Sequence, residues 1–302
     1  MADRRASDAL ALILTAELRH PRCQMDDKTL IVVSAENNPY MAWQCKLFHF
    51  SCTTRADRTP LIIAHETEAE LHPDFEEILK VGGHVRTAPN YKQTARGDVY
   101  PPRNTPATLL HAVDFCQGQF QSIVLCDPDM IFVRAPQFPA TLSGDYCSYM
   151  NYDLECVDEA RAVLRIPAGS IEEAGESVRC GVPYSVPIKV ARRLAEAWIE
   201  AIDAFPPRKW EDVMYAFGLA AISLDLDVTL TRLSEHNYWP EAMAKADVIH
   251  YCYGDETWNK RQYFREDRAR GVWDSPGEAR PGTILSEIFS QIREAREFYS
   301  SY

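Results

Sequence analysis

The segment Ser122-Ile-Val-Leu-Cys126, followed directly by Asp127-Pro128-Asp129, decides the fold. A short apolar run of this kind is typical of a fully buried strand, and the acidic triplet marks its carboxyl end. Similar runs at residues 30–33 and 60–64 each precede a segment with helical periodicity. Alternating strands and helices predict an α/β protein with a mostly parallel sheet and helices on both faces.

The acidic triplet lies where such sheets bind their ligands, beyond the carboxyl ends of the strands. Two carboxylates one residue apart, Asp127 and Asp129, can hold Mn²⁺ or Mg²⁺ between the protein and a diphosphate. A triplet of this form also arises by chance in polar turns. Its position directly after an apolar strand favours the metal site, and with it a transferase that uses a nucleotide-sugar.

Two other functions stay open at this point. Haloacid-dehalogenase-like phosphatases also carry D-x-D after an apolar strand, and Asp127 would then be the nucleophile. In those enzymes the motif usually ends the first strand and is followed by Thr or Val, whereas here Met130 and Ile131 follow it. The second alternative is a catalytically inactive protein that binds a sugar nucleotide.

Composition limits the class of protein further. The chain has 302 residues, 46% of them hydrophobic, and a formal net charge of −12, so nucleic acid is not an expected partner. The apolar run at residues 9–16 is too short to span a membrane. Nine scattered cysteines without a C-x-x-C pair favour buried free thiols and a cytoplasmic location. Whether the chain forms a homodimer is left open.

Three further positions are candidates for the chemistry. His250 ends the apolar run at residues 247–250 and can complete a metal shell with the two aspartates; the alternative is a core histidine. Glu211 and Asp212 open a helix after Trp210. They either orient an acceptor hydroxyl or are ordinary acidic partners of the helix dipole.

Nucleotide contacts are expected from the first half of the chain. Arg103 and Asn104 precede a helix that begins near residue 105, where backbone N–H groups attract phosphate; otherwise they are loop and cap residues. Ser34 follows the first apolar run, and Tyr40 opens the next helix. Both are candidates for contact with the nucleotide, although Tyr40 fits a core position as well.

Several segments, in order along residues 30–260, carry a resemblance to a known family. They are Asn38-Pro-Tyr-Met-Ala-Trp-Gln44, Tyr100-Pro-Pro-Arg-Asn-Thr-Pro106, Val124-Leu-Cys-Asp-Pro-Asp-Met-Ile131, Cys180-Gly-Val182, Met214-Tyr215-Ala-Phe217 and Ile249-His-Tyr251 with Trp258 and Lys260. In these segments the chain resembles the hydroxyproline O-arabinosyltransferases and the peptidyl serine α-galactosyltransferases. These are glycosyltransferases of the GT-A type.

The resemblance implies a UDP-sugar donor, a divalent metal and transfer that retains the anomeric configuration. The sugar would be similar to arabinofuranose or galactose, and the hydroxyl acceptor a peptide, a glycan or a small molecule. It also implies that His250 is a metal ligand and that Gly181 and Lys260 contact the donor. Val213 stands where the family has Glu, so Glu211 or Asp212 would take that role. Because a helix turns by about 100° per residue, we expect Asp212 to face the cleft and Glu211 to face solvent.

The sequence therefore predicts one GT-A-type, Rossmann-like domain over residues 1–302. Its nucleotide-sugar half covers about residues 28–134 and its acceptor half about residues 135–262. Helical periodicity at about residues 275–302 predicts a C-terminal helical extension. The expected activity is that of a metal-dependent glycosyltransferase.

Overall fold

The main sheet of the protein has seven strands, and the acidic triplet follows one of its central ones. The computed structural model describes residues 28–302 except 67–69, 117, 154 and 206–208. The strands are arranged in the order β3-β2-β1-β4-β7-β6-β8. Their bounds are β1 Thr29–Glu36, β2 Leu61–His65, β3 His84–Ala88, β4 Ser122–Cys126, β6 Ser143–Tyr146, β7 Cys180–Pro187 and β8 Thr229–Thr231.

The first four strands of this order are parallel and form the half expected to bind a nucleotide. They are joined through α2 (Pro39–Arg55), α3 (Pro73–Lys80) and α4 (Asn104–Cys116). Helix α2 begins where it does because the Asn38 side chain accepts the Met41 N–H at 2.9 Å and Pro39 follows the cap. Helix α4 continues directly from a 3₁₀ turn at Pro101–Arg103. The α/β class and the mostly parallel sheet are confirmed.

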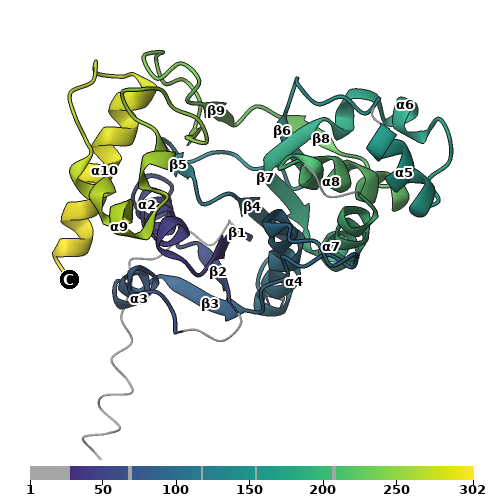
Figure 1. Ribbon diagram of the computed structural model, residues 1–302, viewed down its shortest axis with the longest axis horizontal. Helices are drawn as coiled ribbons and strands as arrows, with labels where there is room; N and C mark the ends of the chain where they lie inside the picture. Colours follow the sequence, from purple (N-terminus) through teal and green to yellow (C-terminus); the bar gives the residue numbers. More distant parts are fainter. Residues whose placement is uncertain (1–27, 67–69, 117, 154, 206–208) are drawn as a thin grey trace, which may run out of the picture.

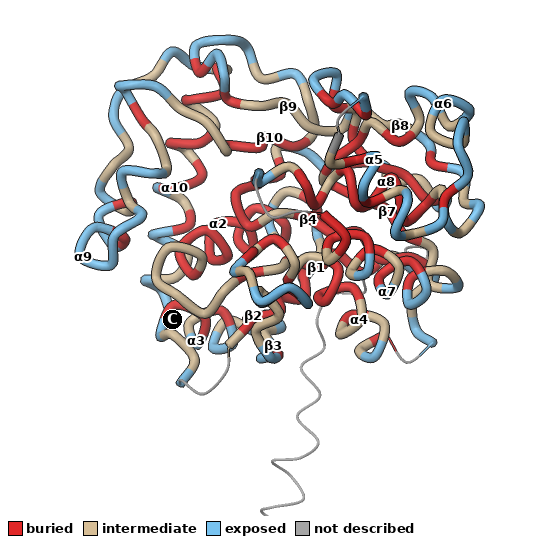
Figure 2. Tube along the Cα trace, turned by 45° about the vertical axis from the view of Figure 1, so that its right-hand side comes forward, coloured by how far each residue is buried: buried red, intermediate tan, exposed pale blue. Residues whose placement is uncertain are grey.

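The other half of the sheet is mixed. Strand β7 is antiparallel to both β4 and β6, and β6 is parallel to β8. Helices α7 (Ile188–Ala204) and α8 (Asp212–Ser223) cover one face of it, while α5 (Glu155–Val163) and α6 (Ser170–Ala174) lie at its outer end (Figure 1). In Figure 2 the buried residues are concentrated in β1, β4, β7 and α2, and most of the exposed residues lie at the periphery.

A second, three-stranded sheet brings distant parts of the chain to the triplet. It consists of β5 (Met130–Phe132), β10 (Val248–His250) and β9 (Ser234–His236), in that order. The run at residues 247–250 therefore belongs to this sheet and not to the main one. Helices α9 (Glu266–Ala269) and α10 (Ile284–Ser300) share a hydrophobic cluster with this sheet, and α10 packs against α2 (Figure 1).

Two sequence expectations concern the membrane and the cysteines. No helix in the described part of the chain is long and apolar enough to cross a bilayer. The apolar run at residues 9–16 lies outside the described residues. Each described cysteine is a free thiol, and most of them are buried, as the sequence predicts. The cytoplasmic location stays a prediction.

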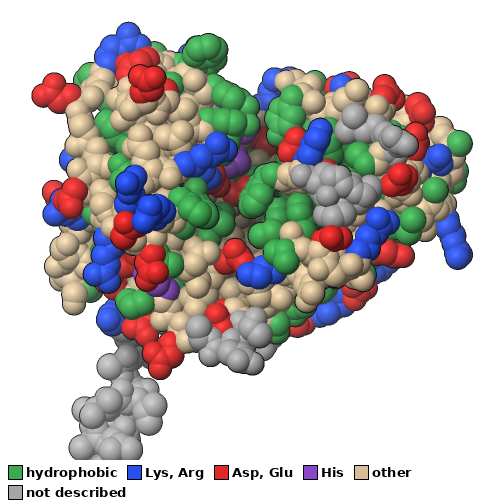
Figure 3. Space-filling view, viewed as in Figure 1, with side chains coloured by type: hydrophobic (Ala, Val, Ile, Leu, Met, Phe, Trp, Pro, Cys, Tyr) green, Lys and Arg blue, Asp and Glu red, His purple; other side chains and the backbone are tan. Residues whose placement is uncertain are grey.

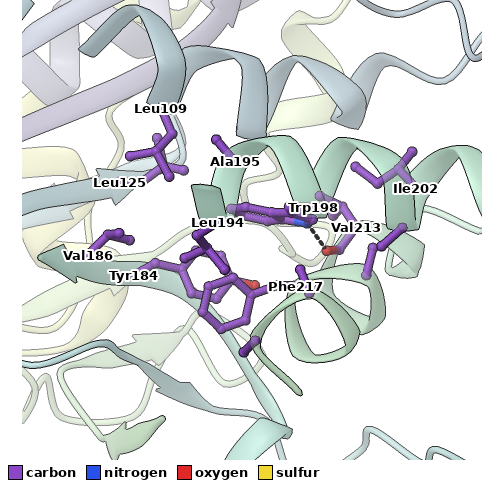
Figure 4. Packing of buried hydrophobic residues seen from close by; sticks show 14 of the residues in the cluster. Leu109, Leu125, Tyr184, Val186, Leu194, Ala195, Trp198, Ile202, Val213 and Phe217 are labelled. Atoms are coloured by element: carbon purple, nitrogen blue, oxygen red, sulfur yellow. Dashed lines mark hydrogen bonds between the residues drawn. The ribbon is translucent and has the colours of Figure 1, made fainter. Parts of the chain in front are cut away.

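Aromatic packing joins α7 and α8 to the mixed half of the sheet (Figure 4). The Trp198 ring lies 5.2 Å from that of Tyr184 and 5.1 Å from that of Phe217, centroid to centroid. Its indole N–H donates to the Val213 carbonyl at 2.7 Å, at the start of α8. This bond fixes the first turn of α8 beside the residues expected to bind an acceptor.

We expect Trp198→Phe to lower the free energy of unfolding by about 1–3 kcal/mol, because it removes that hydrogen bond and leaves a cavity. Denaturant unfolding followed by circular dichroism measures the change. Trp239→Phe is the matched control, since Trp239 is 78% exposed. It should shift the free energy by no more than about 0.5 kcal/mol. Equal effects of the two variants would contradict the role given to Trp198.

Candidate functional site

A large cavity opens at the carboxyl edge of the parallel strands. Its volume is about 880 Å³, within the range that holds a drug-sized ligand. Figure 3 shows hydrophobic side chains on both walls of a central hollow, with acidic and histidine side chains inside it. The residues lining it that bear on the chemistry are Ser34, Tyr40, Asn104, Asp127, Asp129, Tyr149, Gly181, Trp210, Glu211, Met214, His236, Tyr238, His250, Cys252, Tyr253, Lys260 and Arg261.

The acidic triplet forms the connection between the two sheets. Strand β4 ends at Cys126 and β5 begins at Met130, so the triplet alone makes the turn. The Tyr251 N–H donates to the Asp129 carbonyl at 2.9 Å, which ties the turn to the chain beyond β10. The Asp129 side chain is buried, whereas that of Asp127 is 27% exposed toward the cavity. Both carboxylates are thus held at the floor of the cavity.

His250 reaches these carboxylates through the register of the second sheet. Strand β10 is antiparallel to β5 and places His250 opposite Met130, one residue from Asp129. The His250 Nε2 atom lies 3.2 Å from an oxygen of Asp129 and 3.8 Å from one of Asp127. The sequence predicted this grouping, and the structure brings the three residues together.

Lys260 supplies a positive charge on the other side of Asp129. Its ammonium group forms an ion pair with Oδ2 of Asp129, and its side chain is only 14% exposed. The same nitrogen lies 6.0 Å from the centre of the Tyr40 ring, which also lines the cavity. Lys260 and Tyr40 are therefore neighbours of the acidic pair, although they are far from it in sequence.

The surroundings shift the pKa values of the two aspartates in opposite directions. Burial, together with the nearby Asp129 carboxylate, raises the pKa of Asp127 to about 6. For Asp129, burial would raise the pKa, but Lys260 and His250 outweigh it and hold the pKa well below its ordinary value. Burial lowers the pKa of Lys260, and the Asp129 carboxylate more than offsets this, so the pKa lies above its ordinary value. Asp129 and Lys260 are therefore a charged pair at neutral pH.

Asp127, Asp129 and His250 fit a divalent cation. One ligand atom from each residue can be chosen such that all three lie within 4.8 Å of one another. Two carboxylates and one imidazole are ligands that suit Mn²⁺ and, with water in the remaining positions, Mg²⁺. A cation there would also relieve the repulsion between the two carboxylates. The Asp127 carboxylate is partly exposed to the cavity and can reach such a cation.

Of the residues in the first half of the chain that are expected to contact the nucleotide, all but Arg103 line the cavity. Ser34, Tyr40 and Asn104 line the cavity. The Asn104 amide is already used, because its oxygen accepts the Tyr91 N–H at 2.7 Å and its nitrogen donates to Asn90. Asn104 therefore shapes the wall through the loop that it holds.

Arg103 does not line the cavity. Its guanidinium makes two hydrogen bonds of 2.8 Å to the Asp203 carboxylate on α7 and a third to the Tyr91 carbonyl. The expectation that Arg103 binds the donor is therefore not supported by its position. The physical reason is the bidentate pair with Asp203, which already uses the guanidinium donors and turns the side chain away from the cavity.

On the acceptor side the order of the two acidic residues is the reverse of the expectation. Glu211 lines the cavity, while Asp212 is 4% exposed and accepts the Lys209 N–H at 3.0 Å. Helix α8 begins at Asp212, so its side chain folds back onto the preceding turn. The prediction that Asp212 faces the cleft and Glu211 faces solvent was wrong.

Gly181 lies on the same wall, where a side chain would not fit without displacement. A Cβ atom at this position would approach the Met214 methyl to 2.7 Å and the Cys147 sulfur to 3.2 Å. The methyl is the far end of a flexible side chain, so a small residue at position 181 would have to displace the Met214 side chain.

The cavity residues that sequence reasoning did not find include His236, Tyr238, Cys252 and Tyr253. His236 lies beside His250 because β9 is parallel to β10. The Tyr238 and Tyr253 rings stack at 3.8 Å. Each of these residues comes from a short strand or a loop without periodicity, so only the pairing of β9 with β10 reveals that they lie together.

The solved structures that are similar to this chain include two glycosyltransferases. No protein family and no curated protein sequence matches the chain. The galactosyltransferase LgtC, solved in complex with donor and acceptor sugar analogs, is 12% identical, with 88% of this chain and 99% of that chain covered and a TM-score of 0.48. The bifunctional glycosyltransferase WbbM, in its apo structure, is 11% identical, with 92% of this chain and 52% of that chain covered and a TM-score of 0.47. The resemblance to the hydroxyproline O-arabinosyltransferases stays a prediction.

We expect His250→Ala to weaken Mn²⁺ binding at least about ten-fold, because one of three protein ligands is lost. Titration calorimetry with Mn²⁺ measures the affinity, and thermal unfolding without metal measures the stability. His111→Ala is the control, since His111 contacts Tyr91 and does not line the cavity. A large loss of stability with unchanged Mn²⁺ affinity would make His250 a core residue.

Proposed function

We propose that this protein is a metal-dependent glycosyltransferase that takes a sugar from a UDP-sugar and places it on a hydroxyl acceptor. One observation carries the proposal: Asp127, Asp129 and His250 meet on the floor of the large cavity at the carboxyl edge of the sheet. A nucleoside diphosphate needs its charge neutralised before it can leave a sugar. A carboxylate pair with an imidazole, beside a lysine, is a suitable set of groups for that task.

The distribution of charge in the cavity supports the position of the donor. Lys260, which pairs with Asp129, and Arg261 both line the cavity and would offset the charge of a diphosphate held there. Ser34 and Tyr40 line the adjoining part, at the carboxyl end of β1 and the start of α2. We therefore place the diphosphate at the acidic pair and the nucleoside toward Ser34 and Tyr40. A bound metal would hold the diphosphate there and stabilise its charge as the sugar leaves.

The opposite wall would receive the acceptor. Trp210, Glu211 and Met214 line it, and the Trp210 ring is 61% exposed. An apolar wall with one carboxylate can hold the body of an acceptor and accept a hydrogen bond from its hydroxyl group. Glu211, not Asp212, is the carboxylate in that position.

The proposed reaction retains the anomeric configuration, as the family resemblance implies. The acceptor oxygen attacks the anomeric carbon from the face of the leaving group and forms the new glycosidic bond. The bond from that carbon to the β-phosphate oxygen breaks, and the same oxygen takes the acceptor proton. UDP leaves, so the step needs no separate protein base. Lys260 stays protonated throughout and balances Asp129.

The proposal is tested by UDP release from a panel of UDP-sugars, with Mn²⁺ and with EDTA. We expect metal-dependent release from one sugar, and a loss of at least about 100-fold in Asp129→Asn, because an amide is a poor ligand for a hard cation. Circular dichroism verifies that the variant folds. Near-normal Mn²⁺-dependent release by the variant would overturn the proposal. Phosphorylation of Asp127 by a phosphomonoester would identify a phosphatase instead.

The two acidic residues at α8 give a separate prediction. Glu211→Ala should lower transfer to the acceptor at least about ten-fold and leave UDP binding unchanged, because Glu211 alone of the two lines the cavity and the variant removes the acceptor of the hydroxyl's hydrogen bond. Asp212→Asn should chiefly lower the free energy of unfolding, by roughly 1 kcal/mol, since its carboxylate holds the Lys209 N–H. Transfer assays and denaturant unfolding of both variants measure the two effects. A greater loss of transfer in Asp212→Asn would reverse the assignment.

A further inference from the structure

A second set of metal-binding side chains lies in the same cavity and shares one residue with the first. His236, His250 and Cys252 each offer a ligand atom such that all three lie within 4.8 Å of one another. All three line the cavity, so an ion from solvent can reach them. We infer that this set is a binding site for Zn²⁺, distinct from the acidic pair in its chemistry and mutually exclusive with it through His250.

The geometry of the second sheet produces this set. Strand β9 is parallel to β10 with His236 opposite His250, so the two imidazoles project from the same face of the sheet. Their ring centres are 5.2 Å apart and the rings are inclined by 32°. Cys252 follows His250 by two residues, and its thiol donates to the His250 carbonyl at 3.8 Å. The thiol is thereby kept close to both rings.

The distances suit a tetrahedral ion after small side-chain rotations. Zinc binds imidazole nitrogen at about 2.0–2.1 Å and thiolate sulfur at about 2.3 Å, so neighbouring ligand atoms lie roughly 3.3–3.7 Å apart. The three protein ligands leave a fourth position that water can occupy from the cavity. Cys252 binds as the thiolate, and its proton is released to the solvent.

The two sets differ in the cation that they favour. Carboxylate oxygens of Asp127 and Asp129 suit Mg²⁺ and Mn²⁺, whereas a thiolate with two imidazoles suits zinc. A neutral imidazole has one nitrogen lone pair and therefore binds one ion at a time. When His250 binds Zn²⁺ together with His236 and Cys252, it is lost to the acidic pair. Zinc at this site would thus weaken the binding of Mn²⁺.

The direct test uses metal alone and does not depend on sugar transfer. Co²⁺ replaces zinc as a spectroscopic probe, because a Co²⁺–thiolate bond gives charge-transfer absorption in the near ultraviolet. We expect this absorption in the wild-type protein, its loss in Cys252→Ser and its weakening in His236→Gln. Cys156→Ser is the control, since Cys156 is half-exposed on α5 and does not line the cavity. Absence of the band in the wild-type protein overturns the proposal.

Competition with a chromophoric zinc chelator gives the affinity. We expect Cys252→Ser and His236→Gln each to weaken Zn²⁺ binding at least about ten-fold, with Cys156→Ser and Asp127→Asn close to wild type. Electron paramagnetic resonance of released Mn²⁺ tests the exclusivity: Zn²⁺ should displace Mn²⁺ from the wild-type protein at lower concentration than from Cys252→Ser. Displacement at equal concentrations would mean that zinc merely enters the acidic pair, and would overturn the proposal. Two variants of different ligands keep the test decisive if one of them fails to fold.

Discussion

Repulsion between two carboxylates at the end of a buried strand is the constraint on which the site depends. Asp127 and Asp129 are separated by one residue at the floor of the cavity, where the repulsion between like charges is weakly screened. Strand β4 contributes nothing to offset them, since it is wholly apolar except for Ser122. The compensating groups, His250 and Lys260, come from more than a hundred residues further along the chain. The charge of the acidic pair is therefore compensated by groups that only the tertiary fold brings to it.

The second sheet and the C-terminal helix α10 hold these compensating groups in position. Strand β5 continues directly from the triplet, and the antiparallel pairing of β10 with it places His250 at the carboxylates. The Gln291 side chain on α10 donates to the Phe132 carbonyl at the end of β5, 2.9 Å away. Tyr299, near the end of α10, contacts His49 on α2 at 2.7 Å. Helix α10 thus supports the strand that carries the site, although it contributes no residue to the cavity.

Local patterns explain which parts could be predicted. The apolar run before Asp127 correctly predicted the central strand and its ligand-binding edge, because a short, continuous apolar run bounded by turn residues is typical of a buried strand. Arg103 looked equally informative at a helix N-terminus, but its partner Asp203 lies a hundred residues away and no local signal indicates it. The predicted orientations of Glu211 and Asp212 were reversed. Helix α8 starts at Asp212, and the Asp212 side chain therefore turns back onto Lys209. His236 was missed because only the pairing of two three-residue strands brings it to His250.

The position of Lys260 also bears on which cation the cavity prefers. The ammonium group already pairs with one oxygen of Asp129, so an ion entering the acidic pair must share that carboxylate with a fixed positive charge. That charge lowers the affinity of the acidic pair for any cation, but a diphosphate bound beside Lys260 offsets it. Metal and donor should therefore bind the acidic pair cooperatively, whereas the His236, His250 and Cys252 set needs no anion to balance it. On these two proposals, the protein without a nucleotide would favour the thiolate set, and the protein with a nucleotide would favour the carboxylate set. Because the two proposed sites share His250, the nucleotide itself would then select between them.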